Sequence, residues 1–188
     1  MADGQRFART NTVSVPNING TRTWSKNSMK LSRMTRCRPP ADEVAHMRAI
    51  LHEQTRKVNK IRDTHATSHR DFHSENMMLG PDMTYGFDFT EARAKMAVYD
   101  VVDVLKCDIY RDTPVDQIDE AGITKTHRDM FFKGYKHKID KDVLNVSLRG
   151  RMLLDWVSIT RDSHAKIRAD RILYRNLKPR LDVAFAKA

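Results

Sequence analysis

A chain of 188 residues with 40% hydrophobic and 31% charged residues is long enough to bury one core, which excludes wholesale disorder and favours one globular domain. The opening MADGQRFARTNTVSVPNING lacks the apolar run of a signal peptide, and no later stretch is apolar for long enough to cross a membrane. The net charge of +10 would suit a nucleic-acid partner, so its position along the chain decides what it means.

The excess positive charge is concentrated at the N-terminus. Residues 1–38 contain eight Lys or Arg side chains and one acid, whereas the other 150 residues contain 26 bases and 23 acids. We expect this basic arm, residues 1–40, to be a solvated and poorly ordered tail, although it could also attract phosphates of nucleic acid, lipid or another protein. Cys37 and Cys107 lack the spacing of a zinc site or a disulfide scaffold, so we expect free thiols and a cytoplasmic protein.

The segment after Pro40 carries the start signals of a helix. Asp42 and Glu43 lie where the positive N-terminal end of a helix favours acids. Apolar residues follow at helical spacing, at Val44, Met47, Leu51, Val58 and Ile61. The pattern predicts an amphipathic helix of about six turns over residues 41–63, which begins a folded domain of residues 41–188.

Two short strand-like segments follow the polar stretch THATSHRDF. They are NMML at 76–79 and TYGFDF at 84–89, and Gly80-Pro81-Asp82 between them is typical of a turn. We predict a small β-hairpin. From residue 97 the apolar spacing becomes helical again as far as Thr113-Pro114, and further helices are predicted over 115–137, 141–160 and 163–177. The sequence therefore predicts a mainly α fold with a small β-hairpin between its first and second long helices.

The loop and the hairpin carry side chains suited to phosphoryl transfer. This reaction needs a carboxylate that orients and deprotonates the attacking hydroxyl, and oxygen ligands for the magnesium that bridges the phosphates. In HRDFHSEN, Asp71 would be the base and Asn76 a magnesium ligand, while Asp88, followed by Phe89, would be a second ligand. A tight hairpin would bring Asp88 back beside Asn76, so that both oxygens could face one metal ion.

HRDFHSENMML followed by GFDFTEA resembles the catalytic loop and metal-binding strand of the aminoglycoside phosphotransferase and choline kinase family, whose core logic protein kinases share. AVYD at 97–100 is similar to the segment in which an Asp opens the family's next helix, and FFKGY at 131–135 resembles one of its helical segments. The resemblance covers about residues 41–177. It implies a kinase-like C-terminal catalytic lobe that uses ATP and Mg²⁺ to phosphorylate a hydroxyl of a small-molecule or sugar acceptor.

The candidate site residues follow from the motif and the resemblance. The catalytic group is Asp71, His69 and Arg70, with His69 expected to position the loop through hydrogen bonds. The cofactor contacts are Asn76, Asp88 and His73, of which Asn76 and Asp88 would hold the metal. Each has a plainer interpretation: caps or turn residues for Asp71, Asp88 and Asn76, a satisfied histidine for His73, and a surface ion pair for Arg70.

The sequence also departs from the family in ways that leave alternatives open. Arg70 stands where small-molecule members usually have glycine, and Thr90 stands where protein kinases have glycine, which puts their switching mechanism in doubt. No two of the seven glycines are close enough for a phosphate-covering G-x-G loop, so the N-terminal β lobe is expected to be absent. A longer enzyme or a second chain would then supply it as a partner.

The sequence leaves two other functions open, and it contains a second His-Arg-Asp that can be compared with the first. The chain could be an inactive kinase-like binding module that docks an anionic partner through its basic arm. A nucleic-acid-binding helical protein ranks last, because it leaves the HRDFHSEN and DF spacing unexplained. A second His-Arg-Asp at His127, Arg128 and Asp129 is followed by Gly134 where the first copy has asparagine, so we expect that copy to be inert on a helix surface.

Overall fold

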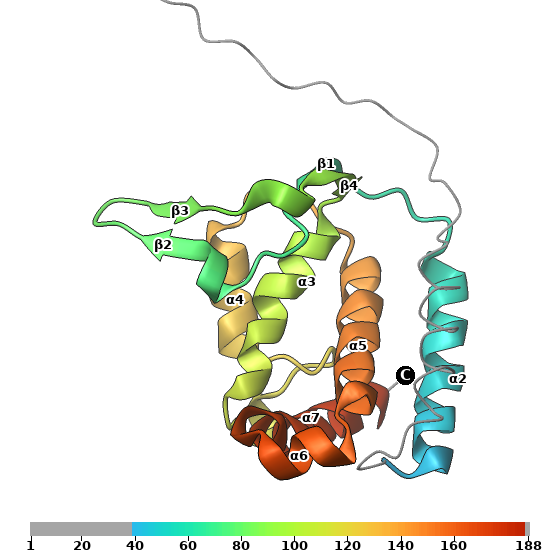
Figure 1. Cartoon of the computed structure of the whole chain (residues 1–188). Helices are drawn as coiled ribbons and strands as arrows, with labels where there is room; N and C mark the ends of the chain where they lie inside the picture. Colours follow the sequence, from blue (N-terminus) through green and yellow to red (C-terminus); the bar gives the residue numbers. More distant parts are fainter. Residues whose placement is uncertain (1–38, 187–188) are drawn as a thin grey trace, which may run out of the picture.

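The computed structural model describes residues 39–186, and residues 1–38 of the basic arm, with Cys37, lie outside this range, as do residues 187–188. The described chain forms packed α-helices with two small two-stranded antiparallel sheets at one end (Figure 1). The predicted mainly α fold with a β-hairpin is therefore confirmed. Within residues 39–186, no helix combines the length and apolar character needed to span a membrane.

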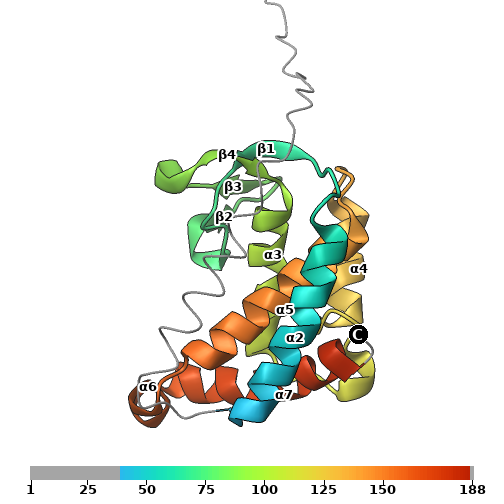
Figure 2. The same cartoon turned by 90° about the vertical axis from the view of Figure 1, so that its right-hand side faces the viewer.

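Helix α5 (Lys141–Ser158) forms the centre of the core. It packs against α2 (Ala41–Val58), α3 (Val98–Lys106) and α7 (Arg168–Ala186), and Figure 2 shows α2 lying across it. Four side chains at intervals of four residues are each at most 1% exposed: Leu144, Leu148, Met152 and Trp156. Burying each contributes on the order of 1.5–3 kcal/mol. The helix begins where Asp140 accepts hydrogen bonds from the backbone of Asp142 and Val143.

The helix bounds differ from the predictions at several ends. Helix α2 stops at Val58, one turn earlier than predicted, because the chain turns there and Ile61 N donates to Val58 O at 3.0 Å. Helix α3 ends at Lys106 and continues as the 3-10 helix Cys107–Tyr110. The helix predicted over 163–177 is two helices, α6 (Arg161–Lys166) and α7, and α7 continues through Pro179 to Ala186.

The helix predicted over 115–137 is mostly wrong. Only α4 (Lys125–Gly134) is α-helical, preceded by the short 3-10 helix Val115–Gln117. Asp119 interrupts the segment, because its Oδ1 accepts hydrogen bonds from the backbone N–H groups of Ala121 and Ile123. Gly122 then adopts φ +86°, a left-handed conformation that suits glycine and ends any helix. Local side-chain bonding therefore outweighs the apolar spacing here.

One of the two sheets lies within the candidate catalytic segment, and the other joins its two ends. In the predicted hairpin, β2 (Met77–Leu79) pairs with β3 (Thr84–Gly86), with Met78 opposite Tyr85. A second sheet that the sequence did not suggest pairs β1 (His65–Ser68) with β4 (Arg93–Met96), with Ser68 opposite Arg93. Because β1 and β4 flank residues 69–92, their pairing closes the base of the excursion that carries all six candidate site residues.

Candidate active site

Asp100, in the first turn of α3, holds the start of the candidate catalytic loop. Its carboxylate accepts hydrogen bonds from Ser68 Oγ at 2.7 Å, His69 N at 2.8 Å and Arg70 N at 2.9 Å. Arg70 has φ 72°, a costly conformation for a residue other than glycine. Three bonds to one charged group can stabilise this backbone. Asp100 therefore positions the backbone of the loop, whereas the AVYD resemblance predicted only an Asp at the start of a helix.

His69 connects the loop to the end of the hairpin. The side chain is buried, and its Nε2 donates to Phe87 O at 2.8 Å. The ring also contacts Phe72 and Phe89, with centroid separations of 5.4 and 4.6 Å. Its Nδ1 is buried without a hydrogen-bond partner among the described residues. These contacts agree with the expected positioning role of His69. The buried ring is shielded from solvent.

Asp71, His73 and Asn76 meet on the loop. Asn76 Nδ2 donates to Asp71 O at 2.9 Å and to Asp71 Oδ2 at 3.2 Å, and it lies 3.4 Å from His73 Nε2. His73 Nε2 is 3.4 Å from Asp71 Oδ2. The Asp71 side chain is 59% exposed, so a substrate hydroxyl could reach it, whereas Asn76 is only 8% exposed. The five-residue spacing therefore does bring the carboxylate and the amide together.

Asp88 lies at the end of the hairpin, one residue after Phe87, which pairs with Asn76. Phe87 N donates to Asn76 O at 3.1 Å, which extends the β2–β3 pairing to the residue just before Asp88. Asp88 adopts φ 60° and ψ 62°, and its Oδ1 accepts a hydrogen bond from Thr90 Oγ1 at 2.8 Å. Asp88 is thus a second residue in the loop with a left-handed backbone, a feature that concentrates at functional sites.

Asn76 and Asp88 carry side-chain oxygens of the kind that a magnesium ion bound mainly by phosphate and water would take. Magnesium commonly takes one or two protein oxygen ligands besides phosphate oxygens and water. Because the Asn76 amide nitrogen faces Asp71, its amide oxygen remains for a cation, and Asp88 supplies a carboxylate. Residues 39–186 contain no group of three His, Cys, Asp or Glu side chains able to hold a metal by themselves. A cation here would therefore depend on its nucleotide.

The Arg70 side chain forms an ion pair with Glu91 at the surface. Arg70 Nη1 and Arg93 Nη2 each lie 3.2 Å from Glu91 Oε2. Lys95, on the same side of β4 as Arg93, has a pKa below its usual value because of partial burial and repulsion by Arg70 and Arg93. These contacts match the surface ion pair that was the plainer interpretation of Arg70.

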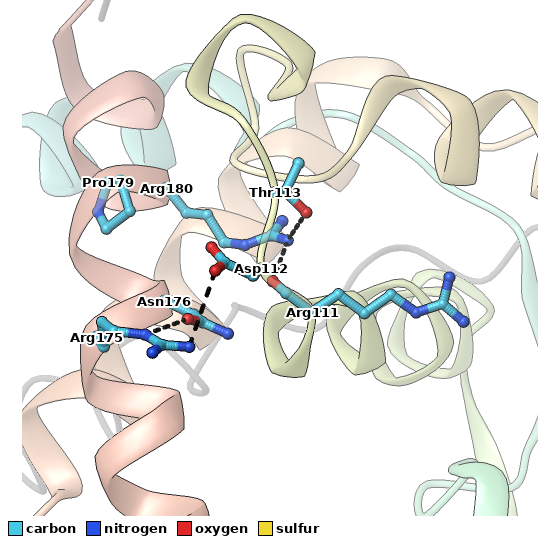
Figure 3. Close-up of a pocket in the computed structure, with 7 residues that line it drawn as sticks. All are labelled: Arg111, Asp112, Thr113, Arg175, Asn176, Pro179 and Arg180. Carbon is cyan, nitrogen blue, oxygen red and sulfur yellow. Dashed lines mark hydrogen bonds and ion pairs between the residues drawn. The ribbon is translucent and has the colours of Figure 1, made fainter.

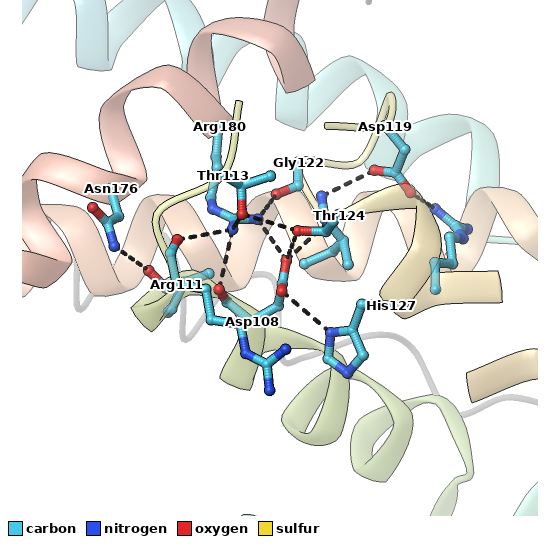
Figure 4. Close-up of polar contacts among 12 residues, drawn as sticks. Asp108, Arg111, Thr113, Asp119, Gly122, Thr124, His127, Asn176 and Arg180 are labelled. Carbon is cyan, nitrogen blue, oxygen red and sulfur yellow. Dashed lines mark hydrogen bonds and ion pairs between the residues drawn. The ribbon is translucent and has the colours of Figure 1, made fainter. Parts of the chain in front are cut away.

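A buried ion pair was missed by sequence reasoning. Arg180 Nη1 donates to Asp108 Oδ2 at 2.7 Å and to Gly122 O at 2.9 Å, and both charged side chains are 1% exposed (Figure 4). Thr124 donates to the same Asp108 oxygen from its backbone N at 2.8 Å and its hydroxyl at 2.5 Å. No local signal could reveal a pair that is 72 residues apart in the sequence.

Two small cavities lie near this network, and neither is lined by Asp71 or Asp88. One, of about 190 Å³, lies beside α7 and is lined by Arg111, Asp112, Arg175 and Arg180 among others (Figure 3). The other, of about 180 Å³, includes Met77, Asp108 and His127. Both are smaller than the roughly 300 Å³ at which ordinary small-molecule sites begin. Neither one is the site that the motif predicts.

The second His-Arg-Asp lies on α4, as predicted, but one of its residues is structural. Arg128 is only 13% exposed, and it binds Asp119 Oδ2 at 2.8 Å and Asn145 Oδ1 at 2.7 Å. His127 Nδ1 lies 3.4 Å from Asp108 Oδ1. The expectation that this copy merely lies on a helix surface is therefore wrong for Arg128, which ties the turn at Asp119 to α5.

Comparisons of the chain with protein-family models, with curated proteins and with solved structures gave no match.

Proposed function

We propose that this chain is the catalytic lobe of an ATP-dependent phosphotransferase of the kinase-like type, which moves the γ-phosphate to a hydroxyl of a small-molecule or sugar acceptor. The observation that carries the proposal is the contact of Asn76 with Asp71 at the point where the hairpin returns the chain to Asp88. A base, an amide oxygen and a carboxylate in one loop are the groups that this reaction requires.

Each residue has a role that its contacts support. Asp71 is exposed and would accept the proton of the acceptor hydroxyl, while Asn76 holds its carboxylate in place. Asn76 and Asp88 would bind the metal, which when present neutralises charge on the phosphates. His69 and Asp100 position the loop through the bonds to Phe87 O and to the backbone of residues 69 and 70. His73, whose Nε2 lies 3.4 Å from Asp71 Oδ2, would contact a phosphate.

The proposal is tested by nucleotide binding. Isothermal titration calorimetry with ATP, in the presence of magnesium or of EDTA, should show magnesium-dependent binding by the wild-type chain that Asp88→Asn removes. The matched control is Asp82→Asn, which makes the same change at an exposed turn of the same hairpin. Equal binding by the wild type and Asp88→Asn would refute the proposal. Asp71→Ala should retain nucleotide binding and lose about 10²–10⁴-fold in phosphate transfer to a bound acceptor.

A second function, an inactive kinase-like binding module, is favoured by one specific observation. The hairpin that would face the nucleotide leaves Met78, Leu79 and Tyr85 more than half exposed, as a surface used for binding a macromolecule would. If the wild type binds no ATP, and an Asp71→Ala, Asp88→Ala double variant still binds the polyanion heparin as the wild type does, this second function is the better description.

A further inference from the structure

The β2–β3 hairpin presents an unusual concentration of exposed apolar side chains. It projects away from the helices (Figure 1), and the chain from residue 78 to residue 89 contains six of the eleven large hydrophobic residues that are exposed within residues 39–186. We call these six the hairpin surface: Met78, Leu79, Met83, Tyr85, Phe87 and Phe89. It includes both faces of the hairpin, because consecutive side chains of a strand, such as Met78 and Leu79, point to opposite faces. A two-stranded hairpin is marginal by itself in water, and exposed apolar patches mark interaction sites.

The charge around the hairpin surface identifies the kind of segment that would cover it. Residues 71–91 contain five acids and no Lys or Arg, although the whole chain has a net charge of +10. Glu91 is paired with Arg70 and Arg93, which flank this segment, so the acids without a Lys or Arg partner among the described residues are Asp71, Glu75, Asp82 and Asp88. The segment that binds here should therefore be basic and should also carry apolar side chains. Residues 1–38 meet both conditions, because they combine eight Lys or Arg and one acid with apolar residues that include Phe7 and Trp24.

We infer that residues 1–38 of the basic arm dock on the hairpin surface of their own chain. This inference stands independently of the proposed function. The arm joins the domain at the start of α2, at the end of the molecule away from the hairpin (Figure 1). Its 38 residues can extend to about 125 Å, whereas a domain of about 150 residues is only about 40 Å across.

The covalent link between the arm and its own domain favours the arm over other segments that could bind the hairpin surface. A segment linked to its own binding surface has an effective concentration on the order of millimolar, so modest contacts are enough for docking. The attraction between arm and hairpin is also electrostatic at the surface, and it should weaken in salt, because the Debye length falls to about 3 Å at 1 M. Docking itself should therefore weaken as the ionic strength rises.

Trp24 provides a probe, because the only other tryptophan, Trp156, is 1% exposed in the core. Acrylamide quenching of the full chain, corrected with a Trp24→Phe variant for the signal of Trp156, reports how exposed Trp24 is. The test variant is Leu79→Ser with Asp82→Lys, on the hairpin. The matched control is Met130→Ser with Asp129→Lys, which makes the same two changes at exposed positions of α4.

At low salt, the quenching constant of Trp24 should be at least about twofold lower in the wild type and in the control than in the hairpin variant, since a docked indole is shielded from water. One molar salt should bring the wild type to the value of the hairpin variant. Equal quenching of Trp24 in the wild type and the hairpin variant at low salt would overturn the inference. Protection that appears only together with a dimer in sedimentation velocity would also overturn it, in favour of the arm of a second copy.

Discussion

Asp108→Asn should reveal how much the buried ion pair stabilises the fold. The substitution keeps the shape of the side chain and an oxygen for Thr124, but it removes the charge that faces Arg180 at 2.7 Å. The Arg180 guanidinium would remain 1% exposed and would keep its bonds to the carbonyls of Gly122, Asp108 and Arg111. The variant therefore isolates the charge of Asp108 from the packing around it.

The expected cost is about 3 kcal/mol. Removing one partner of a buried ion pair typically costs about 3–5 kcal/mol, because the other charge stays buried without compensation. The lower end applies here, since three carbonyl oxygens still receive hydrogen bonds from Arg180. Out of a total stability of about 5–15 kcal/mol, a loss of this size is large. In Asp108→Asn with Arg180→Met, the cost should fall at least about 1 kcal/mol below the sum of the two single variants, because the charges are coupled.

Urea unfolding followed by far-ultraviolet circular dichroism measures these costs. Asp129→Asn, the same change at an exposed position of α4, is the control and should stay within about 0.5 kcal/mol of the wild type. Burial raises the pKa of Asp108, but hydrogen bonds from Thr124 and the charge of Arg180 outweigh it and hold the pKa below the usual value of 3.8. The charge therefore contributes fully above pH 3.8, and the difference between the wild type and Asp108→Asn should shrink as the pH falls below it. A cost under 1 kcal/mol at pH 7 would refute this reasoning.

Two further substitutions test the turn and the loop. Gly122→Ala should cost about 1–3 kcal/mol, because φ is +86° and the new Cβ would meet the side chain of Met152, whereas Gly134→Ala, with open space around it, should stabilise α4 by about 0.5–1 kcal/mol in the same unfolding assay. Asp100→Ala should speed amide hydrogen exchange at residues 69 and 70 by at least about tenfold, because both N–H groups lose a charged acceptor. Exchange in α5 should not change, and unchanged exchange in the loop would show that Asp100 does not hold it.

The parts of the fold that the sequence predicts are those set by local patterns. The apolar spacing of α5 and the start of α2 depend on neighbours within a few residues, and both helices begin within one residue of the predicted positions. The hairpin is equally local, since Gly80 N donates to Met83 O across the predicted turn. The β1–β4 sheet is not, because its strands are separated by the whole catalytic segment and each has only four residues.

Helix ends were predicted less well because tertiary contacts decide them. Helix α7 passes through Pro179, which removes a backbone donor and normally ends or kinks a helix. Burial of Leu177, Leu181 and Phe185 continues the apolar face beyond that point, which favours continuing the helix. The opposite happens at Asp119, where a side chain bonds the backbone and replaces a predicted helix with a turn.

The candidate site was also predicted only in part, because some of its contacts form between residues that are far apart in the sequence. The motif singled out Asp71 and Asn76 as separate groups, but it did not predict that the Asn76 amide donates to the Asp71 carboxylate, which the tight loop brings about. The role of His69 as a link was predicted, but its acceptor, Phe87 O, becomes its neighbour only through the hairpin. Asp100 is 30 to 32 residues from the groups that it holds, and the resemblance at AVYD predicted only an Asp at the start of a helix.

The two left-handed residues explain why so many contacts converge on this loop. Arg70 and Asp88 are the only residues other than glycine with positive φ within residues 39–186, and each such conformation costs on the order of 1–3 kcal/mol. Asp100 holds the backbone at Arg70, and His69 holds the carbonyl of Phe87 just before Asp88. Under the proposed function, these two conformations would set the positions of the base Asp71 and of the metal ligand Asp88 near the two ends of one loop.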